Sequence, residues 1–224
     1  LALLSAQKAR RGWKGQIVTN PNCSTVALAM GLAPLKPFGI RAAVATTMQA
    51  ISGAGYPGVP SMDIVGNVIP YIGGEEEKMQ QETQKILGRF AGDHIEPLPA
   101  RVSAHCNRVP VVDGHTVTVS VTLEKHVTRE ELLAAYRAFQ SIPQQKGCPS
   151  APVPAVLYLE EENRPQPRRD SMRGNGMTVT VGRLRECPAM GWKFVCMGHN
   201  TIRGAAGAAV LNAELMREEG LIRR

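Results

Sequence analysis

A single cysteine, at the junction between a turn and a helix, is the residue of this chain best suited to covalent chemistry. Cys23 lies between a turn-forming segment, 20–22, and an apolar run with helical spacing over 26–32. Ser24 or Thr25 can cap this helix, because a short hydroxyl accepts hydrogen bonds from free backbone N–H groups of a first turn. Those donors and the positive end of the helix dipole favour the nucleophilic thiolate over the thiol. The alternative is a small buried hydrophobic residue, which is what most cysteines are.

A thiolate needs partners, and His115 and Arg108 are the best placed to supply them. His115 begins an expected strand beside the turn signal Asp113-Gly114, and Arg108 follows the preceding expected strand. A hairpin-like arrangement of these strands would bring both side chains to one cleft. There an imidazole could take or return a proton, and a guanidinium could hold a carboxylate through two hydrogen bonds. Taken singly, His115 could also be a turn histidine, and Arg108 a surface charge.

Three more polar residues lie at the ends of expected elements. Gln49 closes a buried strand over 42–48, where a polar side chain commonly caps backbone groups. Glu75 and Lys78 share one side of a helix start, because residues three apart are neighbours on a helix surface. That side could bind a charged ligand or simply face solvent.

The elements that must position these residues mix strands and helices without strict alternation. This pattern favours an α+β fold with a mixed β-sheet and helices packed mainly on one face. Residues 56–70 are expected to form a loop, and residues 160–176 a loop or a flexible arm. We expect strands over 17–19, 42–48, 102–106, 115–123, 153–159, 177–184 and 192–197, and helices over 23–32, 75–87, 128–139 and 202–217.

Composition narrows the classes of function. The chain has 224 residues, and its net charge is +7. Its lysines and arginines are dispersed, without the interleaved aromatic side chains that stack on bases, which argues against nucleic-acid binding and favours a small anionic ligand. No apolar run approaches the roughly 20 residues that span a bilayer, so no membrane partner is expected. The five cysteines are odd in number and lack metal-type spacing, which favours the reducing cytoplasm and argues against a metal site.

Read in order, the motifs resemble those of the aspartate-semialdehyde dehydrogenase family, and the fungal and archaeal branch is the most similar. The resemblance covers essentially the whole chain. It rests on Asn20-Pro21-Asn22-Cys23-Ser24-Thr25, Thr47-Met48-Gln49-Ala50-Ile51-Ser52-Gly53-Ala54-Gly55, Glu75-Glu76-Glu77-Lys78, Glu82-Thr83-Gln84-Lys85-Ile86-Leu87, Arg108-Val109-Pro110-Val111, Asp113-Gly114-His115-Thr116 and Asn200-Thr201-Ile202-Arg203-Gly204-Ala205-Ala206-Gly207.

The resemblance implies a reaction and the residues that carry it out. The family interconverts L-aspartyl-4-phosphate and L-aspartate 4-semialdehyde with NADPH and phosphate, on the route to lysine, threonine and methionine. By similarity, Cys23 forms a thioester with the substrate. His115 is the acid/base that serves the thiol and the developing oxygen charge, and Gln49 helps to orient the acyl intermediate.

The resemblance also assigns ligand-binding residues. Arg108 corresponds to the clamp for the substrate α-carboxylate, and Glu75 to the partner of its ammonium group. Lys78 corresponds to a phosphate contact, with Asn22 beside it. A planar guanidinium fork suits a carboxylate, and a carboxylate suits an ammonium group. The positions that resemble the nicotinamide end of the NADP site are Ser52, Gly53 and Asn200.

One unit of the family has no counterpart in these residues. A dinucleotide-binding domain carries a strand–Gly-x-Gly-x-x-Gly–helix unit, whereas the glycines that follow residue 52 are interrupted by Pro57 and Pro60. We therefore expect residues 1–200 to form a catalytic and dimerisation domain of the semialdehyde dehydrogenase type. Residues 201–224 would be a C-terminal helix that packs on an N-terminal Rossmann domain outside this chain.

The resemblance implies a homodimer or homotetramer, and the Val- and Thr-rich strands, without obvious helical cover on one side, agree with it. Two alternatives stay open. One is an enzyme resembling malonyl-CoA reductase, which has less reason to pair Glu75 with an ammonium group. The other is an inactive fragment that only self-associates through its sheet.

Overall fold

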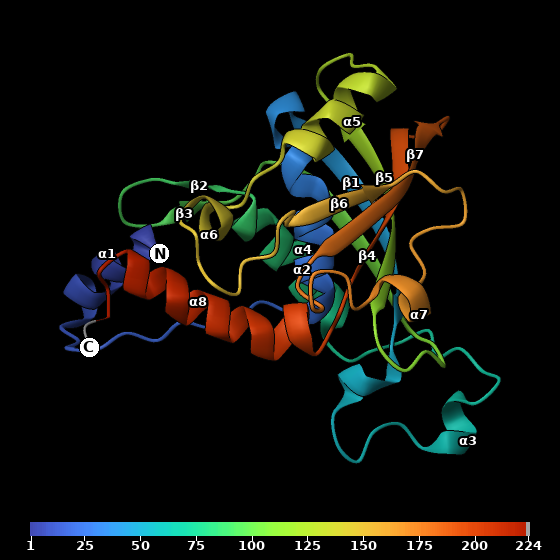
Figure 1. Ribbon diagram of the computed structural model, residues 1–224, viewed down its shortest axis with the longest axis horizontal. Coiled ribbons are helices and arrows are strands. Elements are labelled where there is room, and N and C mark those ends of the chain that lie inside the picture. Colours follow the sequence, from blue (N-terminus) through green and yellow to red (C-terminus); the bar gives the residue numbers. More distant parts are fainter. Residues whose placement is uncertain (223–224) are drawn as a thin grey trace.

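Six strands form one mixed sheet, and the expected site residues lie on its strand ends and on the helices and loops around it (Figure 1). The computed structural model describes residues 1–222. The strand order is β4-β1-β5-β8-β7-β6; β1 pairs in parallel with β4, β6 pairs in parallel with β7, and the other neighbours are antiparallel. The strands are β1 (Ile40–Gln49), β4 (Arg101–Arg108), β5 (His115–Leu123), β6 (Val156–Leu159), β7 (Val179–Cys187) and β8 (Gly191–Gly198), with a separate small ladder of β2 (Arg89–Phe90) and β3 (Ile95–Glu96).

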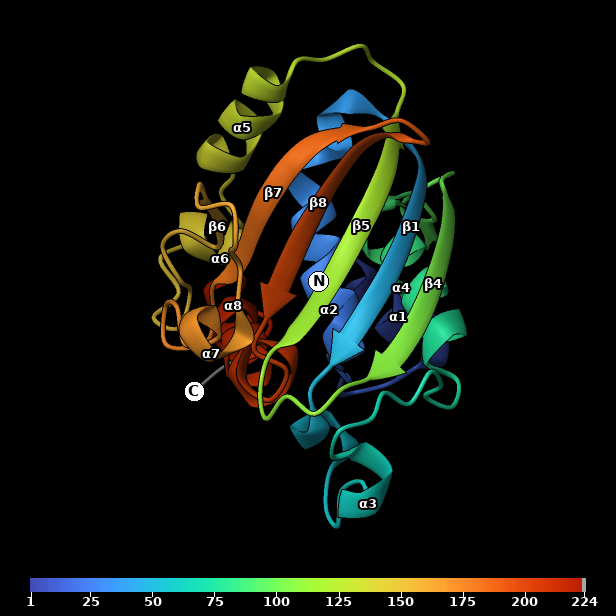
Figure 2. The same cartoon turned by 90° about the vertical axis from the view of Figure 1, so that its right-hand side faces the viewer.

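The helices lie mainly on one face of the sheet, as expected for this α+β fold. Helix α2 packs against β5 and β8, α4 against β4, and α5 against β6. Figure 2 shows the opposite face of β1, β5 and β8 without a covering helix among the described residues. The helices are α1 (Ala2–Arg11), α2 (Cys23–Leu32), α3 (Ser61–Ile64), α4 (Glu75–Ile86), α5 (Arg129–Ala138), α6 (Ile142–Gln145), α7 (Pro167–Asp170) and α8 (Gly207–Glu218), with the 3₁₀ segments η1 (Ala33–Phe38) and η2 (Ile51–Ala54) and the π-helical turn η3 (Ile202–Ala206).

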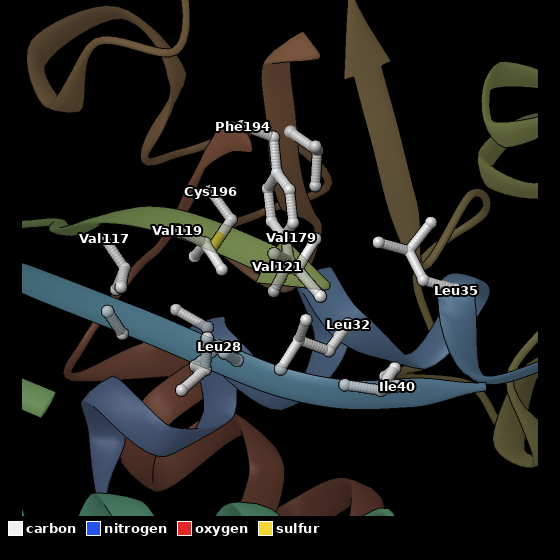
Figure 3. Close-up of a cluster of buried hydrophobic side chains, with 14 of the residues drawn as sticks. Leu28, Leu32, Leu35, Ile40, Val117, Val119, Val121, Val179, Phe194 and Cys196 are labelled. Atoms are coloured by element: carbon white, nitrogen blue, oxygen red, sulfur yellow. The ribbon is translucent and has the colours of Figure 1, made fainter. Parts of the chain in front are cut away.

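The core lies between α2 and the sheet (Figure 3). Val119 and Val121 of β5 are at most 1% exposed and face Leu28 and Leu32 of α2. Alternate residues of a strand point to opposite faces, so Thr118 lies on the uncovered face and is exposed. Each fully buried aliphatic side chain contributes roughly 1.5–3 kcal/mol to stability. Helix α2 is therefore fixed firmly beneath the sheet, together with the cysteine at its start.

The strands that precede and follow the Asp113-Gly114 turn do not form the expected hairpin. Strand β1 lies between β4 and β5, and Gln49 at the end of β1 is the register partner of Arg108 at the end of β4. The buried β1 is a central strand, so its backbone groups need ladder partners on both edges. The connecting segment 109–114 instead pairs with the chain that leaves β1, through Ile51 N donating to Val111 O at 2.7 Å. Arg108 and His115 nevertheless lie close to one another, as expected, because they flank the end of β1 from its two sides.

One other expectation about the chain is wrong, and for a second only one of its two alternatives agrees with the structure. Residues 17–19 form no strand, and Ile17 is 70% exposed. Segment 160–176 was expected to be a loop or a flexible arm, and it is a fixed loop that contains the short α7, in which Arg164 Nε donates to the fully buried Asp170 Oδ2 at 2.7 Å. A buried ion pair holds a segment in one conformation only when both partners are satisfied. Here the backbone N–H of Gln166 also donates to Asp170, at 2.8 Å.

Several local predictions are confirmed. The helix expected over 75–87 is α4, and Thr128 forms a full capping box with Glu131 at the start of α5. The final helix is present, but its first turn is the π-helical η3. Of the C-terminal range 201–224, residues 223 and 224 lie outside the described residues.

Within residues 1–222, every helix is too short or too polar to cross a bilayer, and no group of three metal-ligating side chains is present.

Candidate active site

Cys23 is the first residue of α2, and the helix cap beside it differs from the one expected. The side-chain Oδ1 of Asn22 accepts hydrogen bonds from Ser24 N at 2.9 Å and Thr25 N at 3.1 Å. Ser24 and Thr25 lie inside the helix, where their hydroxyls cannot reach these amides; both hydroxyls are buried without a partner among the described residues. Asn22, and not Ser24 or Thr25, is therefore the N-cap.

The expected thiolate is not the resting state of Cys23. The residue is partly exposed, yet burial raises the pKa of its thiol above the ordinary value, and the Glu75 carboxylate raises it further. The backbone N–H groups of Ser24 and Cys23, and the charge of Arg108, lower this pKa without reversing the shift. Desolvation thus outweighs the helix terminus, and Cys23 rests as a thiol that must lose its proton before it attacks.

Glu75 is held in place from two sides. Its Oε1 accepts from Asn22 Nδ2 at 2.7 Å, and its Oε2 accepts from Gln49 Nε2 at 3.2 Å. Glu82, two turns further along α4, accepts from the backbone N–H of Asn22 at 2.7 Å. The starts of α2 and α4 are thereby joined, and the fully buried Gln49 links both to the end of β1.

His115 is fully buried at the start of β5, and the backbone of Ala50 fixes its orientation. Ala50 N donates to His115 Nδ1 at 3.1 Å, while Nε2 has no partner among the described residues. Burial, followed by the charges of Arg108 and His199, lowers the pKa of His115 to about 3. The ring is therefore neutral at physiological pH.

Arg108 lies beside the same segment and meets His115 across Gly53. Its Nη1 donates to Ala50 O at 2.8 Å, and the residue is 7% exposed. A methyl group on Gly53 would lie 2.9 Å from Arg108 Nη1 and 3.0 Å from His115 Nε2. The absent side chain thus lets the backbone at Gly53 pack directly against both residues, because a Cβ there would clash with them.

Ser52 and Asn200 form the adjoining edge of the site. Asn200 Nδ2 donates to Ser52 Oγ at 2.8 Å, and the backbone N–H of Gly114 donates to Asn200 Oδ1 at 2.9 Å. Asn200 is 3% exposed, and both Nδ2 and Oδ1 of its side-chain amide are hydrogen-bonded within the protein. Ser52 directly precedes Gly53 in the chain, and Gly114 directly precedes His115. The Ser52–Asn200 pair therefore lies next to both residues.

Two residues at the centre of the site, Ala50 and Gly204, were not expected from the sequence to have a role. Ala50 acts only through its backbone, which leaves no side-chain signature. Gly204 in η3 packs on Cys23, because a methyl group at Gly204 would lie 2.6 Å from Cys23 Cβ. The small-residue run 204–209 permits such a close approach, and the chain that approaches is the start of α2 at the cysteine.

The structure thus brings most of the expected residues together, and Lys78 is the exception. Cys23, Glu75 and Arg108 act on one another electrostatically, and Asn22, Gln49, Ser52, Gly53, His115 and Asn200 connect to them through the contacts above. Lys78, one turn along α4 from Glu75, is exposed and makes no ion pair within residues 1–222.

Comparison with known proteins agrees with the resemblance noted in the sequence. Residues 32–203 match the family described as "Semialdehyde dehydrogenase, dimerisation domain". The aspartate-semialdehyde dehydrogenase of Archaeoglobus fulgidus is 50% identical over 222 residues, which cover 99% of this chain and 64% of the relative. That of Methanothermobacter thermautotrophicus is 51% identical over 221 residues, covering 97% of this chain and 64% of the relative.

The likeness extends to a solved structure. The aspartate semialdehyde dehydrogenase of Candida albicans, crystallised with NADP, superposes with a TM-score of 0.85 at 41% identity. The match covers 98% of this chain and 63% of that structure. The chain therefore spans less than two thirds of the length of these relatives.

Proposed function

The chain belongs to the semialdehyde dehydrogenase family, and from that premise we propose that it is the catalytic and dimerisation part of an aspartate-semialdehyde dehydrogenase. The reaction is the NADPH-dependent conversion of L-aspartyl-4-phosphate to L-aspartate 4-semialdehyde, a step of lysine, threonine and methionine biosynthesis. The observation that carries this proposal is the meeting of a helix-terminal cysteine with one buried arginine and one fixed glutamate.

Arg108 and Glu75 bind the two charges of an amino-acid substrate in this proposal. Nη1 of Arg108 is tethered to Ala50 O, so the rest of its planar fork can grip the α-carboxylate through parallel hydrogen bonds. Each oxygen of Glu75 accepts one hydrogen bond from the protein, and a carboxylate oxygen has further acceptor capacity for an ammonium group. The acyl carbon of the bound substrate then faces Cys23.

Cys23 forms the covalent intermediate. Its thiolate attacks the acyl carbon, the carbon–sulfur bond forms, and phosphate leaves with the electrons of the carbon–oxygen bond. Gln49, which already bonds Glu75 at 3.2 Å, holds the acyl group in line. Lys78 and Asn22 are proposed to contact the phosphate. Lys78 is exposed one turn along α4 from Glu75, and its side chain is proposed to meet the leaving group.

Ser52, Gly53 and Asn200 fit the nicotinamide end of an NADP site. The bare Cα of Gly53 lets the chain pass close to Arg108 and His115, where a Cβ would clash, and the Ser52–Asn200 hydrogen bond at 2.8 Å forms a rigid wall next to it. A bound nicotinamide supplies hydride chemistry at this position. Asn200 and Gly114 keep the wall in register with His115.

The rest of the cofactor site is proposed to lie on chain outside these residues. More than a third of the length of each relative lies outside the part that matches this chain. This remainder is long enough to hold the expected dinucleotide-binding domain. We propose that residues 1–200 form the catalytic domain and that the C-terminal helix packs on that second domain. Val210 on α8 is 52% exposed and Ile17 is 70% exposed, as expected for apolar residues that another domain covers.

A homodimer, alone or within a homotetramer, is proposed to form through the uncovered face of the sheet. A groove of about 460 Å³ runs over this face, and its apolar lining includes Met48, Val111 and Val195. A second copy with the same face would exclude water from both grooves. The five cysteines are all free, which supports a place in the reducing cytoplasm.

The test is the full-length enzyme assayed for phosphate-dependent NADPH formation from aspartate semialdehyde. Cys23→Ala is expected to abolish turnover, whereas the matched control Cys187→Ala, at the far end of β7, is expected to leave it unchanged. Appreciable turnover by Cys23→Ala would contradict the covalent route.

Glu75 separates this function from the malonyl-CoA reductase-like alternative. Because an aspartyl substrate carries an ammonium group, Glu75→Gln is expected to raise its KM at least tenfold, through loss of a charge-assisted hydrogen bond of roughly 1.5–3 kcal/mol. Reduction of a CoA thioester that Glu75→Gln leaves unaffected would favour the alternative. A full-length protein that dimerises but reduces neither substrate would favour the remaining alternative, in which the chain only self-associates and has no enzymatic activity.

A further inference from the structure

We propose that Glu76 is a positioning residue for substrate recognition. By accepting a hydrogen bond from the backbone of Cys106, it sets the separation between Glu75 and Arg108. The inference rests on the proposed function, in which those two residues bind the ammonium and carboxylate groups of one amino acid. It adds to that site a residue that does not itself touch the substrate.

Glu76 completes the free edge of the sheet beside the site. Strand β4 is an edge strand, with β1 on one side only. The backbone N–H of Cys106 faces the other side and donates to Glu76 Oε1 at 3.0 Å. Cys106 is 1% exposed, and a buried N–H needs an acceptor. The carboxylate of Glu76 therefore takes the place of a neighbouring strand at this residue.

This hydrogen bond joins the two segments that carry the charge-binding residues, close to both. Glu76 directly follows Glu75 in the first turn of α4. Cys106 lies two residues before Arg108 on β4, so both side chains point to the same face of the strand. The ammonium and carboxylate groups of an α-amino acid are attached to one carbon, so the gap that binds both can vary little. A shift of the first turn of α4 along β4 would change this gap directly.

A second hydrogen bond fastens α4 to the same part of the sheet, but at the far end of the helix. Gln84 Nε2 donates to Ala100 O at 2.8 Å, and Gln84 lies more than two turns from Glu75. Glu76 thus holds the end of α4 that carries the proposed ligand carboxylate, and Gln84 holds the other end.

The side chain of Cys106 connects the same point to Gln49. Burial raises the pKa of the Cys106 thiol to about 11, and hydrogen bonds with Thr47 and Gln49 act in the opposite direction. The thiol therefore stays protonated at physiological pH. Gln49 in turn donates to Glu75 Oε2 at 3.2 Å. A displacement of Cys106 would consequently reach the residue proposed to align the acyl group as well.

The alternative is that Glu76 only complements the dipole of α4. Glu75, Glu76 and Glu77 all lie in the first turn, where negative side chains are favourable. Glu77 is exposed, whereas Glu76 is half-buried and bonded to Cys106. The two roles have different requirements, because the dipole needs a charge and the Cys106 N–H needs an acceptor oxygen.

Two replacements of similar length separate these requirements in the full-length enzyme. Glu76→Gln and Glu76→Met both lose the charge, but only glutamine keeps a strong acceptor for the Cys106 N–H. KM for aspartate semialdehyde is expected to rise about 10- to 100-fold in Glu76→Met, because a small misplacement of binding groups is costly, and less than about threefold in Glu76→Gln. Glu77→Met, exposed in the same turn, is the matched control and is expected to keep the wild-type KM. A wild-type KM in Glu76→Met, or equal rises in Glu76→Met and Glu76→Gln, would overturn the proposal.

The division between KM and kcat distinguishes positioning from folding. A merely structural role would reduce the fraction of active enzyme, which lowers the apparent kcat and leaves KM unchanged. That pattern in Glu76→Met would overturn the proposal. If circular dichroism shows Glu76→Met to be unfolded, Glu76→Asp replaces it. The aspartate side chain is one methylene shorter, so the same rise in KM is expected because the carboxylate no longer reaches Cys106 without moving α4.

A ligand with one charge fewer provides the closing test. Succinate semialdehyde lacks the ammonium group, so Arg108 alone binds its charge, and its inhibition constant is expected to agree within about twofold between wild type and Glu76→Met. An increase as large as that in KM for aspartate semialdehyde would show general damage at Arg108 and overturn the inference. Wild-type enzyme that does not oxidise aspartate semialdehyde would contradict the proposed function and this inference together. Wild-type turnover combined with an unaltered KM in Glu76→Met would contradict this inference alone.

Discussion

At the scale of single residues, the site holds a positive and a negative group apart by fixing each to backbone or helix. Arg108 is tied to Ala50 O at 2.8 Å, and Glu75 is held by Asn22 and Gln49. Neither side chain needs to be ordered when an amino acid binds, so little conformational entropy is lost. Glu75 and Arg108 also pull the pKa of Cys23 in opposite directions, so a substrate that neutralises Glu75 would favour the thiolate.

Arg108→Lys is the sharpest residue-scale test of substrate recognition. Lysine keeps the charge but cannot reproduce a two-pronged contact with a carboxylate, and loss of one charge-assisted hydrogen bond costs roughly 1.5–3 kcal/mol. We expect KM for aspartate semialdehyde to rise about 10- to 100-fold in steady-state kinetics. Arg101→Lys, exposed at the other end of β4, is the matched control and is expected to leave KM unchanged. An unaltered KM in Arg108→Lys would remove Arg108 from this role.

The sequence predicted the residue types of the site better than their ionisation. Local spacing located Cys23 at a helix start and His115 at a strand start. It did not show that Asn22 is the cap, or that burial raises the pKa of Cys23. The position of the first helical residue decides the cap, and the burial of Cys23 depends on residues distant in sequence, such as Gly204 of η3, which packs on it. Neither is encoded in the residues next to the cysteine.

At the scale of elements, the site depends on how closely η3 approaches the start of α2. The π-helical turn brings Gly204 onto Cys23, where a methyl group would lie 2.6 Å from Cys23 Cβ. Asn20 strengthens the contact by donating to Ala205 O at 2.7 Å. A π turn inside a helix is often found at functional sites, and here it positions the proposed nucleophile.

Gly204→Ala is therefore expected to displace Cys23. The overpacking costs about 1–3 kcal/mol of unfolding free energy, and kcat is expected to fall at least tenfold because the sulfur leaves its line of attack. Chemical denaturation and steady-state assays measure the two effects. Gly15→Ala is the control, because nothing lies within 4 Å of a methyl group there. Wild-type kcat in Gly204→Ala would show that the close contact is not needed.

The segment that contains α7 gives a pH prediction at the same scale. Burial alone would raise the pKa of Asp170, but the hydrogen bonds from Arg164 and Gln166 outweigh it and hold this pKa below its ordinary value of 3.8. The unfolded state consequently binds more protons as pH falls. The stabilisation is complete above the ordinary carboxyl pKa and disappears as pH drops through the folded value.

Asp170→Asn should accordingly lose stability mainly at neutral pH. We expect a loss of about 1–3 kcal/mol at pH 7, with a smaller difference from wild type at pH 3, in urea denaturation at both values. Asp63→Asn, on the exposed helix α3, is the control and is expected to match wild type. An equal loss at both pH values would place the effect in packing and not in ionisation.

The strand order was the part of the fold that local patterns could not supply. Alternation correctly indicated β5, and an amphipathic run with a capping box correctly indicated α5. The Asp113-Gly114 signal suggested a hairpin of β4 and β5, yet β1 lies between them. Pairing partners are chosen by contacts between strands about 60 residues apart in sequence, and a turn signal carries no information about such contacts.

At the scale of the whole molecule, helices cover the sheet on one face only. Helices α2 and α4 cover one side, and the other side presents β1, β5 and β8 (Figure 2). Thr118 lies on the exposed side of the central strand β5, beside the groove that Met48 and Val195 line. In a two-fold dimer the same residue appears on both copies, so one substitution places two like groups at the interface.

Thr118→Arg is expected to convert the proposed dimer to a monomer in the full-length protein. Two buried, unpaired guanidinium groups cost several kcal/mol, which exceeds the margin of a micromolar association. Sedimentation velocity between 1 and 20 μM measures the change, with wild type expected to sediment as a dimer or tetramer. Gln145→Arg, exposed on α6 at the helical side of the sheet, adds the same group elsewhere and should leave the assembly intact. A wild-type assembly in Thr118→Arg would show that the copies meet through another surface.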